Sequence, residues 1–147
     1  RLTGKLGEVM QESANIAFTW VRHMAARFAV PAEFWEKNSF HLHVPAGATP
    51  KDGPSAGITL ASALLSLARD KPLRRGIAMT GELSLVGRVL PIGGLKEKVI
   101  AARRNRLKSV IIPEGNRRDM EEIPEHVREG LTFHLVSAMD EVIERIF

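Results

Sequence analysis

Cysteine and tyrosine are both absent from this sequence of 147 residues, and aromatic residues make up only 5% of it. Without cysteine the chain forms no disulfide, has no thiol nucleophile and cannot bind zinc through thiolates, and it fits a reducing compartment. No apolar run reaches the length of a membrane span, and no signal-peptide pattern is present. These absences predict a soluble, cytoplasmic protein with no membrane partner.

Two common nucleotide-binding motifs are missing, because neither G-x-x-x-x-G-K-[ST] nor G-x-G-x-x-G occurs. We therefore expect no ATP, dinucleotide or other cofactor to bind this chain in the usual way. The zinc motif H-E-x-x-H is missing as well. His41 and His43 share one face of a predicted strand and would suit a metal, but no third ligand stands at a typical spacing. We favour surface or packed histidines and expect no metal site.

Neither positive nor negative charge is concentrated in one part of this chain. Lys and Arg total 21 against 17 Asp and Glu, which gives a formal net charge of +4. The basic residues form short clusters at 103–104, 106–108 and 117–118. A nucleic-acid groove usually combines such charge with aromatic stacking platforms, which are scarce here. We interpret the clusters as solvated faces, and a basic nucleic-acid-binding module remains the alternative.

The length and composition fit one domain. A chain of 147 residues with 44% hydrophobic content is suited to a single hydrophobic core. It begins at Arg1 and not at Met, inside a segment with a structured pattern. We therefore expect residues 1–147 to be a single domain cut from a longer polypeptide.

Four helices are predicted from the spacing of apolar residues. They cover residues 5–29, 55–68, 94–106 and 137–147, and Ser137 is the expected N-cap of the last. Residues 55–68 are apolar on nearly every side, so this helix is expected to lie in the centre of the domain. Pro31 ends the first helix.

Strands are predicted where apolar and polar residues alternate, or where short β-branched runs occur. They cover residues 40–44, 77–80, 110–113 and 132–136, together with a hairpin of 83–85 and 88–90 that turns at Val86 and Gly87. Strands and helices mixed in this order predict an α/β or α+β fold.

Ser55 stands between the Gly53-Pro54 corner and the apolar helix of residues 55–68. One interpretation is a helix N-cap, a position that serine favours. The other is a nucleophile. Gly53 and Gly57 remove side chains on both sides of Ser55, which we expect to make room for a substrate, and the free N–H groups at the start of a helix stabilise an oxyanion.

A serine nucleophile needs a base, because its neutral hydroxyl is a weak nucleophile. In the helix at 94–106, Leu95, Val99 and Ala102 form the apolar stripe. Lys98 lies about 60° to one side of this stripe and Lys96 about 100° to the other. Lys98 is therefore the better candidate for burial, which lowers a lysine pKa and frees the amine to accept a proton. An ordinary solvent-exposed helix lysine is the alternative that spacing alone leaves open.

Three longer motifs go beyond these patterns: PKDGPSAG at 50–57, TGELSLVGRVLPIGGLKEKVIAA at 80–102 and VIIPEGNRRDMEEIP at 110–124. They closely resemble the proteolytic domain of Lon, the ATP-dependent protease, in its A-type form. The resemblance covers essentially the whole chain. It implies the Lon-protease α/β fold, with mixed small sheets and packed helices.

The resemblance also implies roles for individual residues. Ser55 matches the family's nucleophile and Lys98 its general base, so that the catalytic pair is a Ser-Lys dyad without histidine. We expect Ser55 to be both this nucleophile and the N-cap of its helix. Thr80 matches a threonine whose hydroxyl helps to hold the lysine. Asp52 and Gly53, in the nucleophile motif, are supporting residues, and Asp52, His41 and His43 match residues that line the site.

The implied activity is that of a serine endopeptidase within an ATP-dependent protease that degrades misfolded and regulatory proteins. Members form homohexameric rings in which an AAA+ ATPase module, using ATP and magnesium, unfolds the substrates. That module and the N-terminal domains are absent from residues 1–147. Expected partners are unfolded proteins or peptides and further copies of the chain, with weak DNA binding in the full-length protein. The alternatives are a nucleic-acid-binding module and a ring-forming structural domain without activity.

Overall fold

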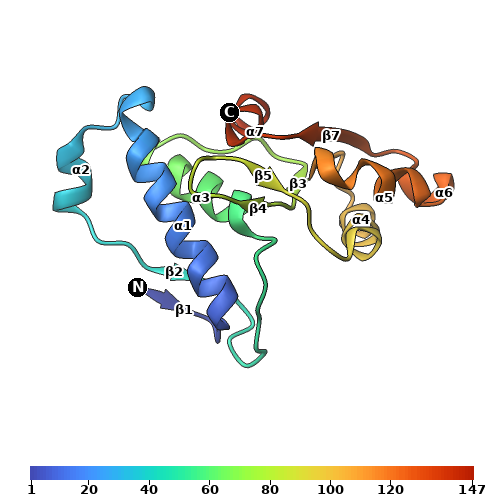
Figure 1. Cartoon of the computed structure of the whole chain (residues 1–147), viewed down its shortest axis with the longest axis horizontal. Helices are drawn as coiled ribbons and strands as arrows, with labels where there is room; N and C mark the ends of the chain where they lie inside the picture. The colour runs from blue at the N-terminus through green and yellow to red at the C-terminus, as the bar shows by residue number, and fades with distance from the viewer.

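A three-stranded parallel sheet lies between two groups of helices in the computed structural model, which describes all of residues 1–147 (Figure 1). Its strands are β3 (Ile77–Met79), β6 (Ser109–Pro113) and β7 (Thr132–Val136), in the order β3-β6-β7. Ala78 lies opposite Val110, and Val110 lies opposite Phe133. Parallel neighbours require crossover connections, which usually contain a helix.

Two smaller sheets accompany the parallel one. β1 (Leu2–Thr3) pairs in parallel with β2 (Leu42–His43), and β4 (Glu82–Leu83) pairs antiparallel with β5 (Val89–Leu90). The β4-β5 hairpin turns over residues 84–87, and Gly87 takes a φ of +85°, which suits glycine. The hairpin and the strands predicted at 40–44, 77–80, 110–113 and 132–136 are thus confirmed, with bounds that differ by up to a few residues.

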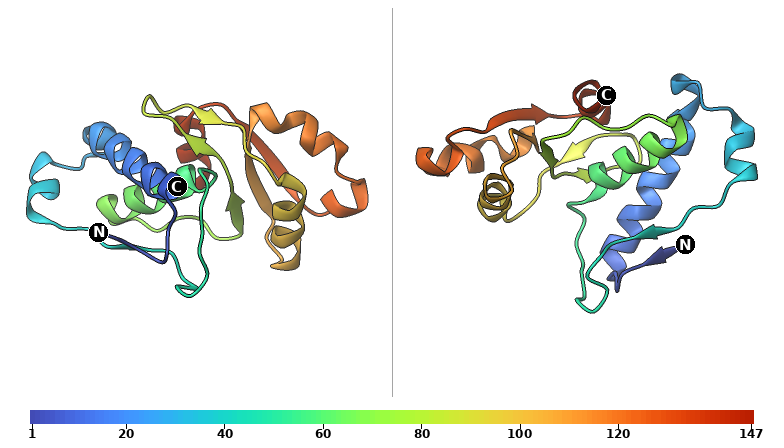
Figure 2. Two further views of the ribbon diagram at one scale, coloured as in Figure 1. Left: turned by 60° about the horizontal axis from the view of Figure 1, so that its bottom comes forward. Right: turned by 180° about the vertical axis from the view of Figure 1, so that it is seen from behind.

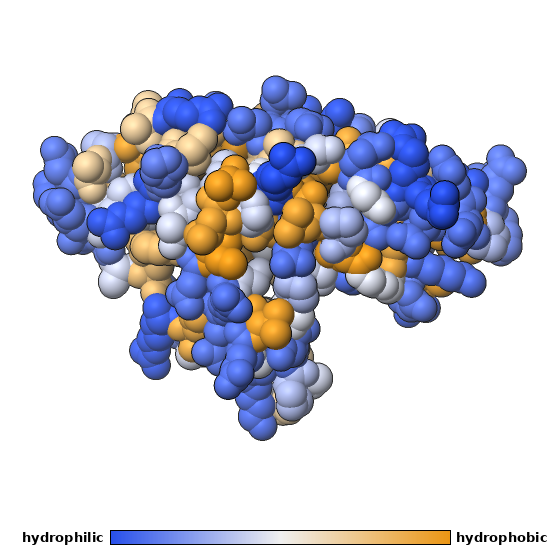
Figure 3. All heavy atoms as spheres, in the orientation of Figure 1, coloured by the Kyte–Doolittle hydropathy of each residue, from blue (hydrophilic) through white to orange (hydrophobic).

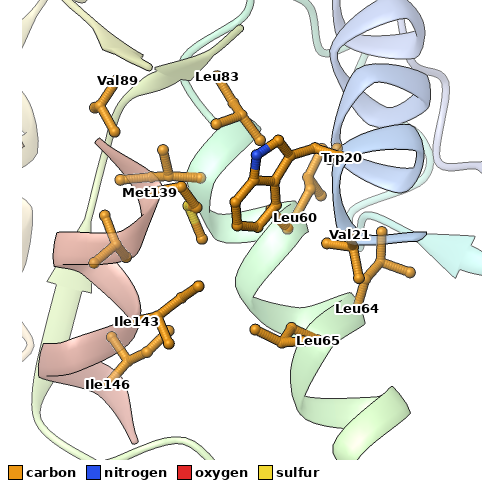
Figure 4. Close-up of a cluster of buried hydrophobic side chains, with 14 of the residues drawn as sticks. Trp20, Val21, Leu60, Leu64, Leu65, Leu83, Val89, Met139, Ile143 and Ile146 are labelled. Carbon is orange, nitrogen blue, oxygen red and sulfur yellow. The ribbon is translucent and has the colours of Figure 1, made fainter. Parts of the chain in front are cut away.

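The larger hydrophobic core lies between α1 (Glu8–Met24), α3 (Gly57–Arg69) and α7 (Met139–Ile146). Figure 4 shows side chains of these three helices meeting those of the hairpin. Trp20 and Val21 come from α1, Leu65 from α3 and Ile146 from α7, and all are nearly inaccessible to solvent. The prediction that residues 55–68 form a central helix is confirmed for most of its length, although Leu67 near its end is 62% exposed.

A second, smaller core lies beneath α4 (Leu95–Arg104). It contains the predicted stripe of α4 together with residues of β6 and of the segment after it: Leu95, Val99, Ala102, Val110, Ile112 and Ile123. Ile111 on β6 belongs to the larger core instead. Successive residues of a strand point to opposite faces of the sheet, so β6 contributes to both cores.

Several short elements were not predicted. They are β1, α2 (Ala32–Lys37), α5 (Arg117–Glu122), α6 (Glu125–Arg128) and the 3-10 turns Ala25–Phe28 and Glu114–Asn116. The first predicted helix therefore ends in a 3-10 turn, and Ala29 closes it with a left-handed φ of 60°. The N-cap prediction for Ser137 is wrong, because α7 begins at Met139 with Ala138 as N-cap and without a side-chain cap bond.

Helices lie at both ends of the molecule. Figures 1 and 2 show α1 and α2 at one end of the molecule and α4, α5 and α6 at the other, and the segment between β2 and α3 extends away from the body. Figure 3 shows a mainly hydrophilic surface over the end formed by α5 and α6, with the most apolar surface nearer the middle of this face. No helix combines the length and apolar character needed to cross a membrane.

Candidate active site

Ser55 lies in a turn immediately before α3. The N–H of Gly57 donates to the carbonyl of Pro54 at 3.2 Å, and the carbonyl of Ser55 accepts from the N–H of Gly81 at 2.9 Å. The helix begins at Gly57 with Ala56 as its N-cap and without a side-chain cap bond, so the N-cap prediction for Ser55 is wrong. The turn keeps the hydroxyl of Ser55 free of hydrogen bonds within the chain.

Lys98 lies on α4, half-buried beside the predicted apolar stripe, whereas Lys96 is exposed. Both placements agree with the helical spacing. Burial lowers the pKa of Lys98 below its ordinary value, because removing water from around an ammonium disfavours its charged form. Its Nζ donates to the hydroxyl of Thr80 at 3.4 Å and to the carbonyl of Gly93 at 3.3 Å.

Thr80 connects the turn of Ser55 with Lys98. It is only 5% exposed, and it follows β3 directly. Its hydroxyl donates to the carbonyl of Ser55 at 3.3 Å and accepts from Nζ of Lys98 at 3.4 Å. A single side chain thus contacts both the turn that carries Ser55 and the lysine on α4.

These three side chains line one cavity of about 360 Å³ between α3, β3, β6 and α4. Much of the remaining lining is apolar and comes from Ala78, Met79, Ala101, Ala102, Leu107 and Val110. A second cavity, of about 290 Å³, lies near β1 and α1, but it contains neither a lysine nor a histidine. A serine hydroxyl and a lysine amine therefore occur together in the first cavity and not in the second.

Asp52 and Gly53 do not line this cavity. The carboxylate of Asp52 accepts from the N–H of Met10, in the first turn of α1, at 2.9 Å, and from the N–H of Gly53 at 2.8 Å. Gly53 takes a φ of +112°, a backbone conformation that favours glycine. Both residues thus shape the backbone that leads to Ser55, and their supporting role in the reaction stays a prediction.

His41 and His43 also lie away from this cavity. The hydroxyl of Thr3 lies 2.8 Å from a ring nitrogen of each, which ties the β2 segment to β1. No group of three or more histidine and carboxylate side chains is arranged to hold a metal ion. The structure therefore gives the two histidines a packing contact and does not bring them to Ser55.

Gly57 has a different use from the one expected. A Cβ at this position would lie 2.8 Å from the backbone nitrogen of Leu83 and 3.2 Å from Oγ of Ser13. The missing side chain therefore makes room for β4 and α1, and not for a substrate. Sequence patterns gave no sign of Gly81, whose N–H fixes the carbonyl of Ser55, because that pairing joins residues 26 positions apart.

Comparison with known proteins adds independent evidence. A family model described as Lon protease (S16) C-terminal proteolytic domain matches residues 1–147. Lon protease 1 of Borreliella burgdorferi is 56% identical over 147 residues, which cover 100% of this chain and 18% of that protein. Lon protease 1 of Bacillus subtilis is 56% identical over 143 residues, 97% of this chain and 18% of that protein.

A plant relative is similar to the same extent. Lon protease homolog 1, mitochondrial, of Arabidopsis thaliana is 54% identical over 146 residues, which cover 99% of this chain and 16% of that protein. The chain thus spans less than a fifth of the length of these curated relatives. Because the family model matches the whole sequence and these relatives align along nearly all of it, the chain belongs to the family of Lon protease C-terminal proteolytic domains, as its motifs predict.

Proposed function

We propose that this domain is a serine endopeptidase in which Ser55 is the nucleophile and Lys98 the general base. The observation that carries the proposal is the shared cavity: a free serine hydroxyl and a lysine of lowered pKa line it together, and Thr80 contacts both parts. A neutral lysine amine is able to accept a proton, whereas a charged ammonium is not. The family membership supports the same assignment.

The reaction has two halves. In the first, Lys98 takes the proton of Ser55 as the hydroxyl oxygen bonds to the peptide carbonyl carbon. The C–N bond then breaks, Lys98 returns the proton to the leaving amine, and the substrate acyl group stays esterified to Ser55. In the second, Lys98 takes a proton from water as the water attacks the ester, and the proton returns to Ser55 as the C–O bond breaks. Ser55 then carries its hydroxyl again, and Lys98 is again a neutral amine.

Two backbone groups are suited to stabilise the oxyanion. The N–H groups of Ser55 and Ala56 have no acceptor within the chain, and both residues line the cavity. Each such donor typically lowers the barrier by about 2.7–4 kcal/mol, since it meets the negative charge that develops on the carbonyl oxygen.

The substrates proposed are peptides and unfolded proteins. The apolar wall of the cavity supports an apolar side chain next to the cleaved bond, because burial there removes apolar surface from water. Peptide cleavage by this mechanism requires no cofactor and no metal. ATP and magnesium would serve a separate ATPase module in the longer protein, and degradation of folded proteins would depend on that module.

The assembly proposed is a homo-oligomer, with a hexameric ring as its full form. The support is the family resemblance, and light scattering of the purified chain tests it. A cytoplasmic location has the support of the cysteine-free composition. Nothing in the site's geometry calls for nucleic acid.

The deciding experiment is hydrolysis of an unstructured fluorogenic peptide without ATP. We expect Ser55→Ala and Lys98→Met to abolish cleavage while the proteins stay folded. Lys96→Met is the matched control, because it removes an exposed lysine two positions away on the same helix, and it should retain the activity. Full activity in Lys98→Met would show that the base lies elsewhere and would overturn the proposal.

A further inference from the structure

Lys51, four positions before Ser55, holds together the loop that leads to the nucleophile. Its ammonium donates to three backbone carbonyls, those of Gly4 at 2.7 Å, Ala46 at 2.8 Å and Thr49 at 2.7 Å. An ammonium has three N–H donors, so all of them are used. Two of the bonds close residues 46–51 into a compact turn, and the third joins that turn to the first residues of the chain.

The backbone of Lys51 makes further contacts with the same segment. Its N–H donates to the carbonyl of Lys5 at 3.0 Å, and its carbonyl accepts from the N–H of Gly7 at 2.7 Å. Asp52 then bonds to the first turn of α1, as described above. Residues 51 and 52 are thus fixed to the N-terminal segment and to α1 on one side.

On the other side, Ser55 is held by Thr80 and Gly81. Between these two anchors lie only Gly53 and Pro54, and the carbonyl of Pro54 accepts from the N–H of Gly57 at 3.2 Å and from Oγ of Ser13 at 3.5 Å. Residues 44–56 contain no helix or strand, and they extend away from the body of the molecule (Figure 2). The position of the turn that carries Ser55 therefore depends on both anchors.

The chemistry at this point requires lysine in particular. No carboxylate pairs with the ammonium of Lys51, and the carbonyl oxygens are its only partners. A compact ammonium directs its donors to three converging oxygens, whereas the planar guanidinium of arginine does not. A neutral side chain would leave the three carbonyls without their common donor.

We propose that Lys51 is a positioning residue, which sets the place of Ser55 relative to Lys98 by joining the loop of residues 46–51 to the N-terminal segment. The proposal rests on the peptidase function proposed above. Lys51 does not touch the reacting atoms, since it does not line the cavity. Its loss therefore lowers kcat and the rate at which a fluorophosphonate labels Ser55, and leaves KM nearly unchanged.

The absence of cysteine from the chain permits a specific test. In Lys51→Cys, bromoethylamine converts the new thiol into an aminoethyl thioether, which resembles lysine in length and carries an ammonium. Propylation of the same thiol gives a side chain of equal size without charge. We expect kcat to fall by about ten- to hundredfold in the unmodified and propylated proteins, because small displacements of a reacting group have effects of this order. Aminoethylation should restore it.

Two further measurements separate this role from general stability and from the proposed function. Hydrogen exchange should speed up at residues 46–57 in Lys51→Gln, and not in the control Lys37→Met, which changes an exposed lysine on α2. Unchanged kcat and unchanged exchange in folded Lys51 variants would overturn the proposal. If the parent chain fails to cleave peptides, the peptidase proposal fails, while exchange at residues 46–57 still decides whether Lys51 fixes the loop.

Discussion

At the scale of single residues, the environment of Lys98 determines how the reaction should depend on pH. Burial lowers the pKa of this lysine because the charged form loses water, and the bonds to Thr80 and Gly93 do not include a carboxylate that would offset this. The proposed role of Lys98 as general base requires its neutral amine. The rate must therefore increase as the pH rises through the pKa of Lys98 in the folded protein, and that midpoint must lie below the ordinary lysine value of 10.5.

The first prediction is that kcat/KM has such an acid limb and that Ala101→Asp moves its midpoint upward. Ala101 lines the same cavity one helical turn after Lys98, and a nearby carboxylate favours the charged ammonium. Ala101→Asn has a similar shape without the charge and should leave the midpoint in place. Peptide hydrolysis measured across the pH range checks both variants, and a midpoint that ignores the new carboxylate would contradict Lys98 as the base.

The sequence indicated the side chains around the cavity better than the hydrogen bonds that hold them in place. Long motifs carry Ser55, Thr80 and Lys98, which the structure places around one cavity, and their catalytic roles stay predictions. Helical spacing correctly predicted that Lys98 is more buried than Lys96. The N-cap role of Ser55 could not be judged from the sequence, because the carbonyl that fixes its turn pairs with Gly81. Bonds between residues far apart in the chain leave no local pattern.

At the scale of elements, the packing of α3 against β4 depends on the absence of a side chain at Gly57. Replacing glycine by alanine within a helix normally stabilises it, since alanine has the higher helix propensity. Here the added Cβ would lie 2.8 Å from the backbone nitrogen of Leu83, which is closer than packed atoms approach. Steric overlap should therefore outweigh the gain in propensity.

The second prediction is that Gly57→Ala lowers the free energy of unfolding by about 1–3 kcal/mol, the usual cost of inserting atoms into a packed interior. It should also slow peptide cleavage, because α3 carries the turn of Ser55 at its start. Gly93→Ala is the control for stability, since its Cβ would meet no atom within 4 Å, and we expect a change within about 0.5 kcal/mol. Urea unfolding of both proteins provides the comparison, and equal stability of the two variants would show that α3 is able to shift away from β4.

The long elements were predictable and the short ones were not, for a physical reason. α1, α3 and α4 repeat their apolar positions over several turns, so the pattern itself marks the buried face. β1 has two residues and exists because it pairs with β2, some forty positions away. α5 and α6 have six and four residues, too few for periodicity, and the basic pair at 117–118 was interpreted as a charged surface cluster instead.

At the scale of the whole molecule, the proposed catalytic pair joins two hydrophobic cores. Ser55 precedes α3, which packs in the larger core, and Lys98 is on α4, which covers the smaller one. β6 contributes Ile111 to the first and Ile112 to the second. The distance between nucleophile and base therefore depends on both cores keeping their positions along this strand.

The third prediction is that the two cores unfold together. Ile112→Ala removes buried methyl groups from the smaller core and should lower the free energy of unfolding by about 2–5 kcal/mol. Both tryptophans, Trp20 and Trp35, pack in or against the larger core, so their fluorescence reports on that core alone. If β6 couples the cores, the unfolding midpoint of Ile112→Ala measured by tryptophan fluorescence must fall as far as the midpoint measured by far-ultraviolet circular dichroism. An unchanged fluorescence midpoint with a two-step dichroism curve would mean that the smaller core opens by itself, and that the site is able to separate along β6 while the fold around α1 and α3 persists.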